Sequence, residues 1–321
     1  MKLCESPDFK DAIAAAANYF SSQGLTKHFI EKDYYITEAL RIIAGLYPEE
    51  PNRVIFKGGT SLSKGWKLIE RFSEDIDLFL NPYVAEQHWG QARIDKALKN
   101  IQEKVGEHPN LQLERQTGRS ARGISRNSNY IYTNQFAGTL QNRILLEMGI
   151  RSGNYPTQLV ELSSFLTDFL RKTDNTLGAE DESTFPMMLL HFKRTFVEKL
   201  FAIHNYIEEY QRKNEPFQKY TRHYYDLYQL AQQIEVKEML KSKELDNIKQ
   251  DYHLVSSRYF STSHFPPENL SFANSLALFP NGDLRKAISK AYTEQCKSLC
   301  YGSYPLWEEV EECFSSIRNH L

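Results

Sequence analysis

Two aspartates, Asp75 and Asp77, stand one residue apart in the apolar segment "DIDLFL". Side chains alternate between the two faces of a β-strand, so a strand here would turn both carboxylates to one face and Ile76 and Leu78 to the other. Neighbouring carboxylates repel each other unless a cation compensates them, and carboxylate oxygens are ligands that Mg²⁺ prefers. The spacing therefore predicts a divalent metal site on this strand.

A phosphate-binding turn is predicted just upstream, where "RVIFKGG" (residues 53–59) ends in Gly58 and Gly59. Glycines let backbone N–H groups approach a phosphate closely, and a helix with Thr60 or Ser61 as its N-cap would add the positive end of its dipole. The polar side chains near this turn are the hydroxyls of Thr60, Ser61 and Ser73 and the ammonium groups of Lys57 and Lys64. A phosphate-binding turn beside a metal site is typical of enzymes that use a metal-bound nucleoside triphosphate.

Each of these features also has an ordinary explanation. A glycine pair is usually a turn, and an Asp-x-Asp pair often lies on an exposed edge strand. Lys64 would then be a solvated helix residue and Ser73 the cap of a turn. The order in which the features occur favours one common site.

The elements that must position these residues follow from hydrophobic periodicity and capping signals. In the first half we expect helices at 8–23, 28–46, 60–72 and 90–106, and strands at 53–59, 75–80, 111–116, 128–135 and 143–150. From about residue 184 the pattern is helical, and it predicts helices at 185–213, 221–234, 237–255, 284–299 and 306–321.

The length of 321 residues favours two domains, because a single core rarely organises so long a chain. The polar, acidic stretch 171–183 is the best candidate for the boundary. We therefore predict an α/β domain over residues 1–175 and an all-α domain over residues 176–321.

The overall charge excludes a protein that is basic throughout, because the net charge is -2 and the isoelectric point about 6.5. Nucleic-acid contact would need a local patch. Arg115, Arg119, Arg122 and Arg126 form such a candidate, a basic loop that would hold RNA phosphates or else lie solvated at the surface. The chain has no apolar run long enough to span a membrane and no signal-peptide pattern, so we expect a cytoplasmic protein without membrane contact.

The segments "KGGTSLSK" and "RFSEDID" together resemble the signature of the nucleotidyltransferase superfamily with the polymerase-β-type fold. More narrowly, the chain resembles the AbiEii/AbiGii toxin family of nucleotidyltransferases. Other matching segments are "IEKDYYITEAL" (30–40), "RTFVEKL" (194–200) and "RHYYDLYQL" (222–230). The resemblance implies an α+β fold, in which a polymerase-β-type nucleotidyltransferase domain with a mixed sheet precedes an all-α domain that completes the active-site cleft.

The resemblance also implies roles for individual residues. Gly58, Gly59 and Thr60 or Ser61 would hold phosphate, with help from Ser73 and Lys64, and Asp75 and Asp77 would ligate Mg²⁺ or Mn²⁺. Lys199 would face the triphosphate and Asp226 would face the site from the following helix, while Glu147 is the best candidate for a third carboxylate on a neighbouring strand. His223 stands where many members of the family carry an acid.

The helical segments permit simpler interpretations as well. Arg194 and Glu198 have the i,i+4 spacing of an ordinary helix ion pair. Arg222 and Asp226 have the same spacing in the less favourable order, which favours a partner for Asp226 elsewhere.

The function implied by the resemblance is Mg²⁺-dependent transfer of a nucleotide from an NTP to an acceptor. The acceptor would be RNA, such as the 3′ end of a tRNA, and the enzyme would be the toxin of a toxin–antitoxin or abortive-infection system with a cognate antitoxin. Two alternatives stay open: nucleotidylation of a protein hydroxyl, such as AMPylation, and a non-catalytic module that binds a nucleotide.

Overall fold

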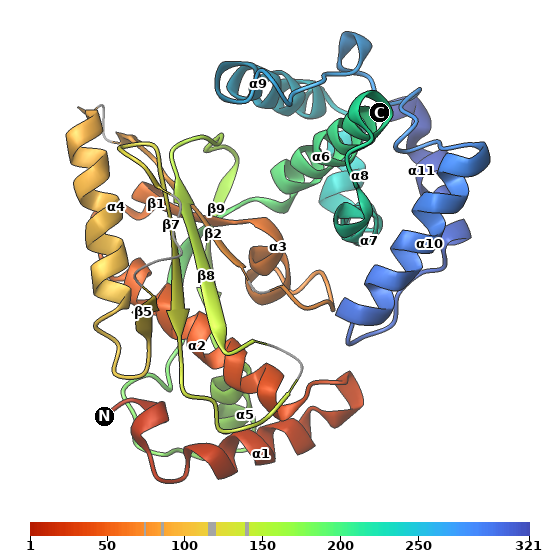
Figure 1. Cartoon of the computed structure of the whole chain (residues 1–321). Coiled ribbons are helices and arrows are strands. Elements are labelled where there is room, and N and C mark those ends of the chain that lie inside the picture. The colour runs from red at the N-terminus through yellow and green to blue at the C-terminus, as the bar shows by residue number, and fades with distance from the viewer. Residues whose placement is uncertain (74, 85–86, 115–119, 139–140) are drawn as a thin grey trace. The chain divides into compact units, whose positions relative to one another are not determined.

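The structure is a computed structural model and describes residues 1–73, 75–84, 87–114, 120–138 and 141–321 (Figure 1). Its contacts divide the chain into two compact units. The first unit consists of residues 1–66 and 73–189, and the second of residues 67–72 and 190–321.

The first unit contains a mixed sheet of eight strands with the order β5-β7-β8-β2-β1-β10-β9, in which β6 pairs with β7. The strands are β1 (Val54–Lys57), β2 (Asp75–Leu80), β5 (Gln112–Glu114), β6 (Ser120–Ala121), β7 (Ser125–Ile131), β8 (Arg143–Gly149), β9 (Thr157–Leu162) and β10 (Phe185–Leu190). A separate pair is formed by β3 (Tyr83–Val84) and β4 (Gln87–His88).

The helices of the first unit are α1 (Phe9–Tyr19), α2 (Lys27–Ala44), α3 (Gly58–Thr60), which continues into a π-helical turn (Ser61–Gly65), α4 (Gln91–Val105) and α5 (Phe165–Lys172). Helix α2 corresponds to the predicted helix 28–46 and ends at Ala44, and its central residues are almost all buried. Their burial indicates that α2 is the central helix of this unit.

Strand β2 lies inside the sheet, antiparallel to β1 and parallel to β8. Ile76 and Leu78 are buried on one face, whereas Asp75 and Asp77 are partly accessible on the other. The predicted alternation along this strand is therefore confirmed, and the explanation of the aspartates as part of an exposed edge strand is wrong.

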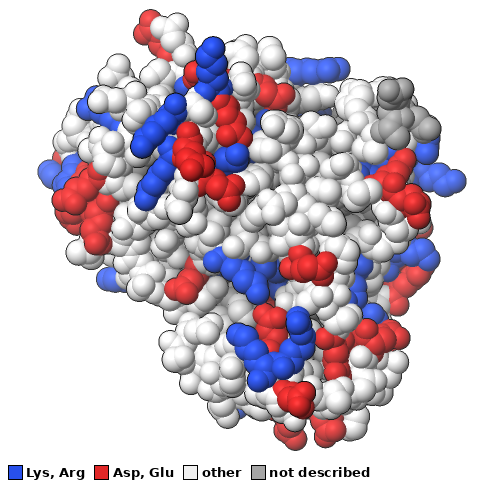
Figure 2. Space-filling model, turned by 180° about the vertical axis from the view of Figure 1, so that it is seen from behind, with Lys and Arg blue, Asp and Glu red and all other residues white. Residues whose placement is uncertain are grey.

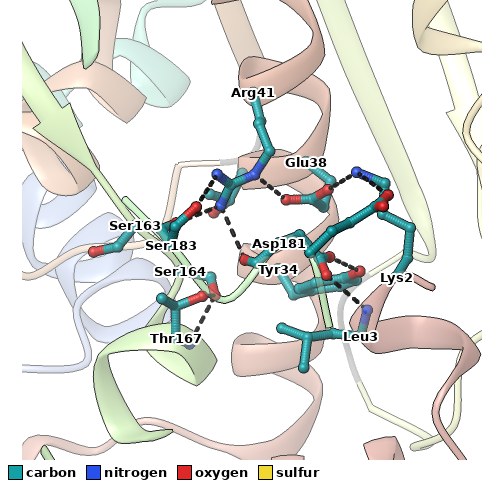
Figure 3. Close-up of polar contacts among 12 residues, drawn as sticks. Lys2, Leu3, Tyr34, Glu38, Arg41, Ser163, Ser164, Thr167, Asp181 and Ser183 are labelled. Atoms are coloured by element: carbon teal, nitrogen blue, oxygen red, sulfur yellow. Dashed lines mark hydrogen bonds and ion pairs between the residues drawn. The ribbon is translucent and has the colours of Figure 1, made fainter. Parts of the chain in front are cut away.

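Polar side chains of α2 tie the N-terminal segment to residues 181–183 (Figure 3). Asp181 accepts hydrogen bonds from the backbone N–H of Leu3 at 2.8 Å and from the hydroxyl of Tyr34 at 2.7 Å. Glu38 forms ion pairs with Lys2 at 3.0 Å and with Arg41 at 2.7 Å. Each of the buried polar side chains Tyr34, Glu38 and Asp181 therefore has a hydrogen-bond or ion-pair partner, as buried polar groups in folded proteins usually do. The segment 30–40, which resembles a family motif, therefore has a structural role in this unit.

The second unit is built from helices α6 (Phe192–Lys213), α7 (Arg222–Ala231), α8 (Ile234–Leu240), α9 (Lys243–Tyr259), α10 (Gly282–Leu299) and α11 (Trp307–Ile317). Its core includes packed aromatic rings, among them Tyr224 against Trp307 with ring centroids 5.1 Å apart. No helix in the described part of the chain is long and apolar enough to cross a membrane.

The predicted helix 60–72 is wrong beyond the π-helical turn that ends at Gly65. Lys67 has a positive φ of 55°, and the backbone after it bonds to the second unit instead of continuing the helix. The N–H of Phe72 donates to the carbonyl of Leu299 at 2.7 Å, and the N–H of Tyr301 donates to the carbonyl of Glu70 at 3.0 Å. These long-range bonds replace the local ones that a helix would have made.

Two further helix predictions need correction. The predicted helix 185–213 begins with strand β10, because a short apolar run such as "FPMMLL" fits a buried strand as well as a helix, and it pairs with β1. The predicted helix 237–255 is two helices, α8 and α9, and the Ser242 hydroxyl caps the second by accepting from the N–H of Glu244.

The pairing of β10 with β1 also bears on the predicted domain boundary after residue 175. Contacts group residues 176–189 with the sheet of the first unit and residues 67–72 with the helices of the second. The division of the chain into domains that fold independently stays a prediction.

Candidate active site

The turn after β1 brings the backbone against the acidic strand. Gly58 has a φ of +79°, and a Cβ atom added to it would lie 2.1 Å from Oδ2 of Asp77. Lys57, the preceding residue, is paired in register with Asp77. Only glycine satisfies both the positive φ and this close approach. The predicted phosphate-binding turn and one of the predicted metal ligands are therefore in direct contact.

The third predicted carboxylate stands beside the other two. Glu147 on β8 is the register partner of Asp77, and its carboxyl is within hydrogen-bonding reach of the Asp77 carboxyl. Burial, and then the negative charge of Asp75, raise the pKa of Glu147. Asn127 from β7 donates to Glu147 at 2.7 Å and so fixes its orientation.

Carboxylates arranged in this way suit a divalent cation, because a cation would compensate the burial and the charge of Asp75 that raise the pKa of Glu147. In the described part of the chain, however, no group of three or more His, Cys, Asp or Glu side chains has the arrangement of a finished metal site. The donor set of Asp75, Asp77 and Glu147 thus fits a metal by its chemistry, and ligation by these three residues stays a prediction.

The hydroxyls predicted to bind phosphate bond to the protein itself. The Thr60 hydroxyl is within hydrogen-bonding distance of the Ser73 hydroxyl at 2.9 Å and of the Asp75 carbonyl at 2.5 Å. The buried Ser61 hydroxyl donates to the carbonyl of Gly58 at 2.9 Å. These bonds hold the glycine turn against the start of β2, so the structure supports a positioning role for these side chains.

The Lys64 side chain is buried, and its contacts are with residues outside the glycine turn. Its ammonium group forms an ion pair with Asp33 of α2 at 2.6 Å and donates to the carbonyl of Ser163 at 3.0 Å. Both side chains of the pair are less than a tenth exposed. The role of Lys64 in binding phosphate stays a prediction. In this structure the ammonium group of Lys64 is paired with the carboxylate of Asp33.

The two remaining predicted residues, Lys199 and Asp226, meet in the second unit. The Lys199 ammonium lies 2.7 Å from Oδ2 of Asp226, whose side chain is completely buried. Asp226 also accepts two hydrogen bonds from Arg71, from Nε at 2.6 Å and from Nη2 at 2.7 Å. The predicted partner of Asp226 outside its own helix is therefore confirmed, although it is not a single residue.

Two basic side chains of this cluster, Arg71 and Lys199, contact the single carboxylate of Asp226. Burial lowers the pKa of Lys199, and the charge of Asp226 opposes that shift. Burial lowers the pKa of His223 to about 3, with the charge of Lys199 acting in the same direction, so His223 is neutral, and its Nδ1 lies 3.2 Å from the Lys199 ammonium group. Although burial opposes ionisation of Asp226, the charges of Arg71 and Lys199 hold its pKa well below the usual range. A cluster in which two basic side chains share one carboxylate is suited to an anionic ligand.

Sequence reasoning missed Arg71. It lies in the segment 67–72 that belongs to the second unit, and its side chain is only 2 % exposed. Nothing local indicates its partner, because Asp226 is 155 residues away along the chain. The ion pair between Arg194 and Glu198, at 3.4 Å, is confirmed.

The predicted basic loop is only partly within the described residues, because Arg115 and Arg119 lie outside them. Arg126 belongs to strand β7 and bonds to α4, through Gln102 at 3.1 Å and Asp95 at 3.7 Å, while Arg122 is exposed. Figure 2 shows basic and acidic side chains interspersed over one face of the molecule. Any RNA contact through this face would therefore be local.

The predicted site residues thus form two clusters, one in each unit. Gly58, Gly59, Thr60, Ser61, Ser73, Asp75, Asp77 and Glu147 gather around the start of β2, and Lys199 and Asp226 gather around Arg71.

Comparison with known proteins yields one family match. Residues 41–314 match the family model described as nucleotidyl transferase AbiEii toxin of type IV toxin–antitoxin systems. No match was found among curated proteins. Among solved structures, the chain is similar to MenT4, a nucleotidyltransferase toxin from Mycobacterium tuberculosis H37Rv, with 14 % identity and a TM-score of 0.49 over 96 % of this chain and 97 % of that one.

Proposed function

Since the chain belongs to the family of AbiEii nucleotidyltransferase toxins of type IV toxin–antitoxin systems, we propose that it transfers a nucleotide from an NTP to an acceptor hydroxyl in a reaction that requires Mg²⁺ or Mn²⁺. The observation that carries this proposal is the contact of Gly58 with Asp77, beside Glu147. It places a backbone turn suited to phosphate against carboxylates suited to a cation.

Asp75, Asp77 and Glu147 would hold the divalent ion or ions. A metal bound there supplies charge for the attacking and leaving oxygens of phosphoryl transfer. Burial and the negative charge of Asp75 raise the pKa of Glu147, and this supports the assignment, because a bound cation would compensate both effects. Asn127 would keep the carboxylate of Glu147 oriented.

The glycine turn would position the triphosphate. The close approach at Gly58 leaves no side chain between the backbone and Asp77, so phosphate oxygens can reach both the N–H groups of this turn and a metal on β2. Thr60, Ser61 and Ser73 would act by holding the turn in place. Lys199 would contribute positive charge to the phosphates, and Asp226 would act by orienting Lys199.

For the acceptor we propose RNA, with the 3′ end of a tRNA as the first candidate. A toxin that modifies tRNA would act in the bacterial cytoplasm, and a cognate antitoxin would oppose it. The family supports the toxin role, while the RNA acceptor, the choice of NTP and the metal are our proposals.

The test is a transfer assay with each of the four α-labelled NTPs, Mg²⁺ and a mixed bacterial tRNA preparation. We expect label in RNA with the unaltered chain, and its loss in Asp75→Asn and Asp77→Asn. Asp283→Asn is the matched control, because that aspartate is 99 % exposed. Label in added protein instead of RNA would favour protein nucleotidylation, and NTP binding without transfer to either acceptor would contradict an enzyme.

A further inference from the structure

A pocket of about 450 Å³ lies in the second unit, between the end of α6 and the turn that precedes α7. The side chains that matter in its lining are Tyr206, Tyr220, Glu209, Glu215, Lys213 and Lys219. A volume of this order accommodates a small planar ligand. None of the site residues discussed above lines this pocket.

Two tyrosines of the lining, Tyr206 and Tyr220, stack face to face, with ring centroids 3.3 Å apart and an interplanar angle of 7°. Since this contact occupies the faces that the rings share, a ligand would stack on an outer face of the pair. The ammonium group of Lys219 lies over the Tyr220 ring at 4.8 Å from its centroid. Since Lys219 is exposed, its contact with the ring is weaker than the stacking of a nucleobase, and a base can replace it.

The charged groups of the lining balance one another. Glu209 and Glu215 supply two negative charges, and Lys213 and Lys219 supply two positive ones. A phosphate site would carry an excess of positive charge, whereas this lining combines hydrogen-bond acceptors and donors. Carboxylates accept hydrogen bonds from the exocyclic amino groups of bases, and lysines donate to ring nitrogens and carbonyl oxygens.

One residue of the pocket lies near the cationic cluster of the same unit. The ring of Tyr220 lies parallel to that of His223 to within 23°, with centroids 6.5 Å apart. His223 in turn lies 3.2 Å from the ammonium group of Lys199. The pocket itself is lined by Tyr220 and by neither His223 nor Lys199.

We propose that this pocket binds a nucleobase, through stacking on the Tyr206–Tyr220 pair and hydrogen bonds to the surrounding carboxylates and lysines. The inference rests on the proposed nucleotidyl transfer and deepens it by naming where a base is recognised. The base belongs either to the NTP or to the last nucleotide of an RNA acceptor, because both present the same chemistry.

The test compares the unaltered chain with Tyr220→Leu, which removes the ring, and with Tyr220→Phe, which keeps it. Equilibrium binding is measured with the four NTPs, with inorganic triphosphate and with mixed bacterial tRNA, and transfer is measured in parallel. We expect Tyr220→Leu to weaken binding of either the NTPs or the RNA by roughly 5- to 100-fold, while inorganic triphosphate binds as before. Tyr220→Phe should bind like the unaltered chain.

The two sources of the base give different results. Weaker NTP binding with unchanged RNA binding assigns the pocket to the NTP, and the reverse assigns it to the acceptor. Glu215 is exposed, so Glu215→Gln should leave folding unchanged. We expect this variant to bind bases that carry an exocyclic amino group with less preference over bases that lack one.

The inference is overturned if Tyr220→Leu binds NTPs and RNA as the unaltered chain does, or if it loses inorganic triphosphate to the same extent as NTPs. Failure of the proposed function looks different. In that case the unaltered chain itself shows neither transfer nor binding of NTPs, and the pocket inference fails with it.

Discussion

Arg71 and Asp226, 155 residues apart in the sequence, form a two-pronged ion pair with bonds of 2.6 and 2.7 Å inside the second unit. Arg71 reaches this position because the chain leaves the first unit at Trp66 and returns to it at Ser73. The segment that carries Arg71 therefore connects the glycine turn to the acidic strand while its side chain is fixed among the helices of the other unit.

Replacing Arg71 by glutamine should destabilise the second unit, because the buried Asp226 carboxylate would lose the two short hydrogen bonds from the guanidinium group and keep Lys199 as its remaining cation. We expect a loss of about 2–4 kcal/mol in the free energy of unfolding, measured by urea denaturation. Arg285→Gln is the matched control, since Arg285 bonds in the same two-pronged way to Glu311 but at the surface. Its loss should be much smaller, and equal losses for the two variants would contradict a special role for the buried pair.

Gly58→Ala tests the contact between the turn and the acidic strand. The variant should lose stability and transfer activity, because the new Cβ atom meets the Asp77 carboxylate at 2.1 Å. Gly178→Ala is the control, because it introduces the same kind of backbone strain without a steric clash. Gly178 also has a positive φ, +73°, but no atom of the described residues lies within 4 Å of its added Cβ.

The expected result is a loss of about 1 kcal/mol for Gly178→Ala, from the backbone alone, with transfer unchanged. Gly58→Ala should lose more stability and nearly all transfer. Should Gly58→Ala retain full activity, close approach at this glycine would not be needed for the reaction.

Lys64→Met distinguishes a structural role of Lys64 from a role at phosphate. Removing the lysine leaves Asp33 buried without its cation, and we expect a loss of about 3 kcal/mol in the free energy of unfolding. The double variant Asp33→Asn, Lys64→Met should recover part of that loss. Binding of NTPs is then measured on the double variant: normal affinity indicates that Lys64 acts through Asp33, whereas weak affinity at restored stability would assign Lys64 to phosphate.

His264 should make the stability of the second unit depend on pH. Burial, together with the neighbouring His253 and His204, lowers its pKa to about 4, and His253 lies 3.0 Å away. In the unfolded chain the pKa of histidine is about 6.5, so the unfolded state binds more protons between these two values. This contribution is present above pH 6.5 and is lost as the pH falls toward 4.

The full difference between these two pKa values corresponds to about 3 kcal/mol, and because solvent partly screens this ring, we expect a loss of about 1–2 kcal/mol over the interval. Urea denaturation at pH 4.5, 5.5 and 7 measures it, and His264→Gln should flatten the dependence. If the free energy of unfolding of His264→Gln changes with pH as steeply as that of the unaltered chain, groups other than His264 cause the pH dependence.

Features that depend on neighbouring residues could be predicted from the sequence. The alternation of "DIDLFL" places Asp75 and Asp77 on one face and Ile76 and Leu78 on the other, because a strand has a period of two. Gly58 was predicted for the same local reason, since a tight turn beside a strand excludes a side chain. The family-level resemblance came from these short segments too, and the family match over residues 41–314 agrees with it.

Which charged side chains meet depends on how distant segments pack, and this could not be predicted from the sequence. Lys64 is bonded to Asp33, and Arg71 to Asp226, through contacts between segments that no local pattern relates. The end of the helix after Gly65 and the strand at the start of 185–213 were decided in the same way. In each case hydrogen bonds and buried ion pairs to distant residues are stronger than the weak local preference for a helix, so the outcome depends on partners that the sequence does not place side by side.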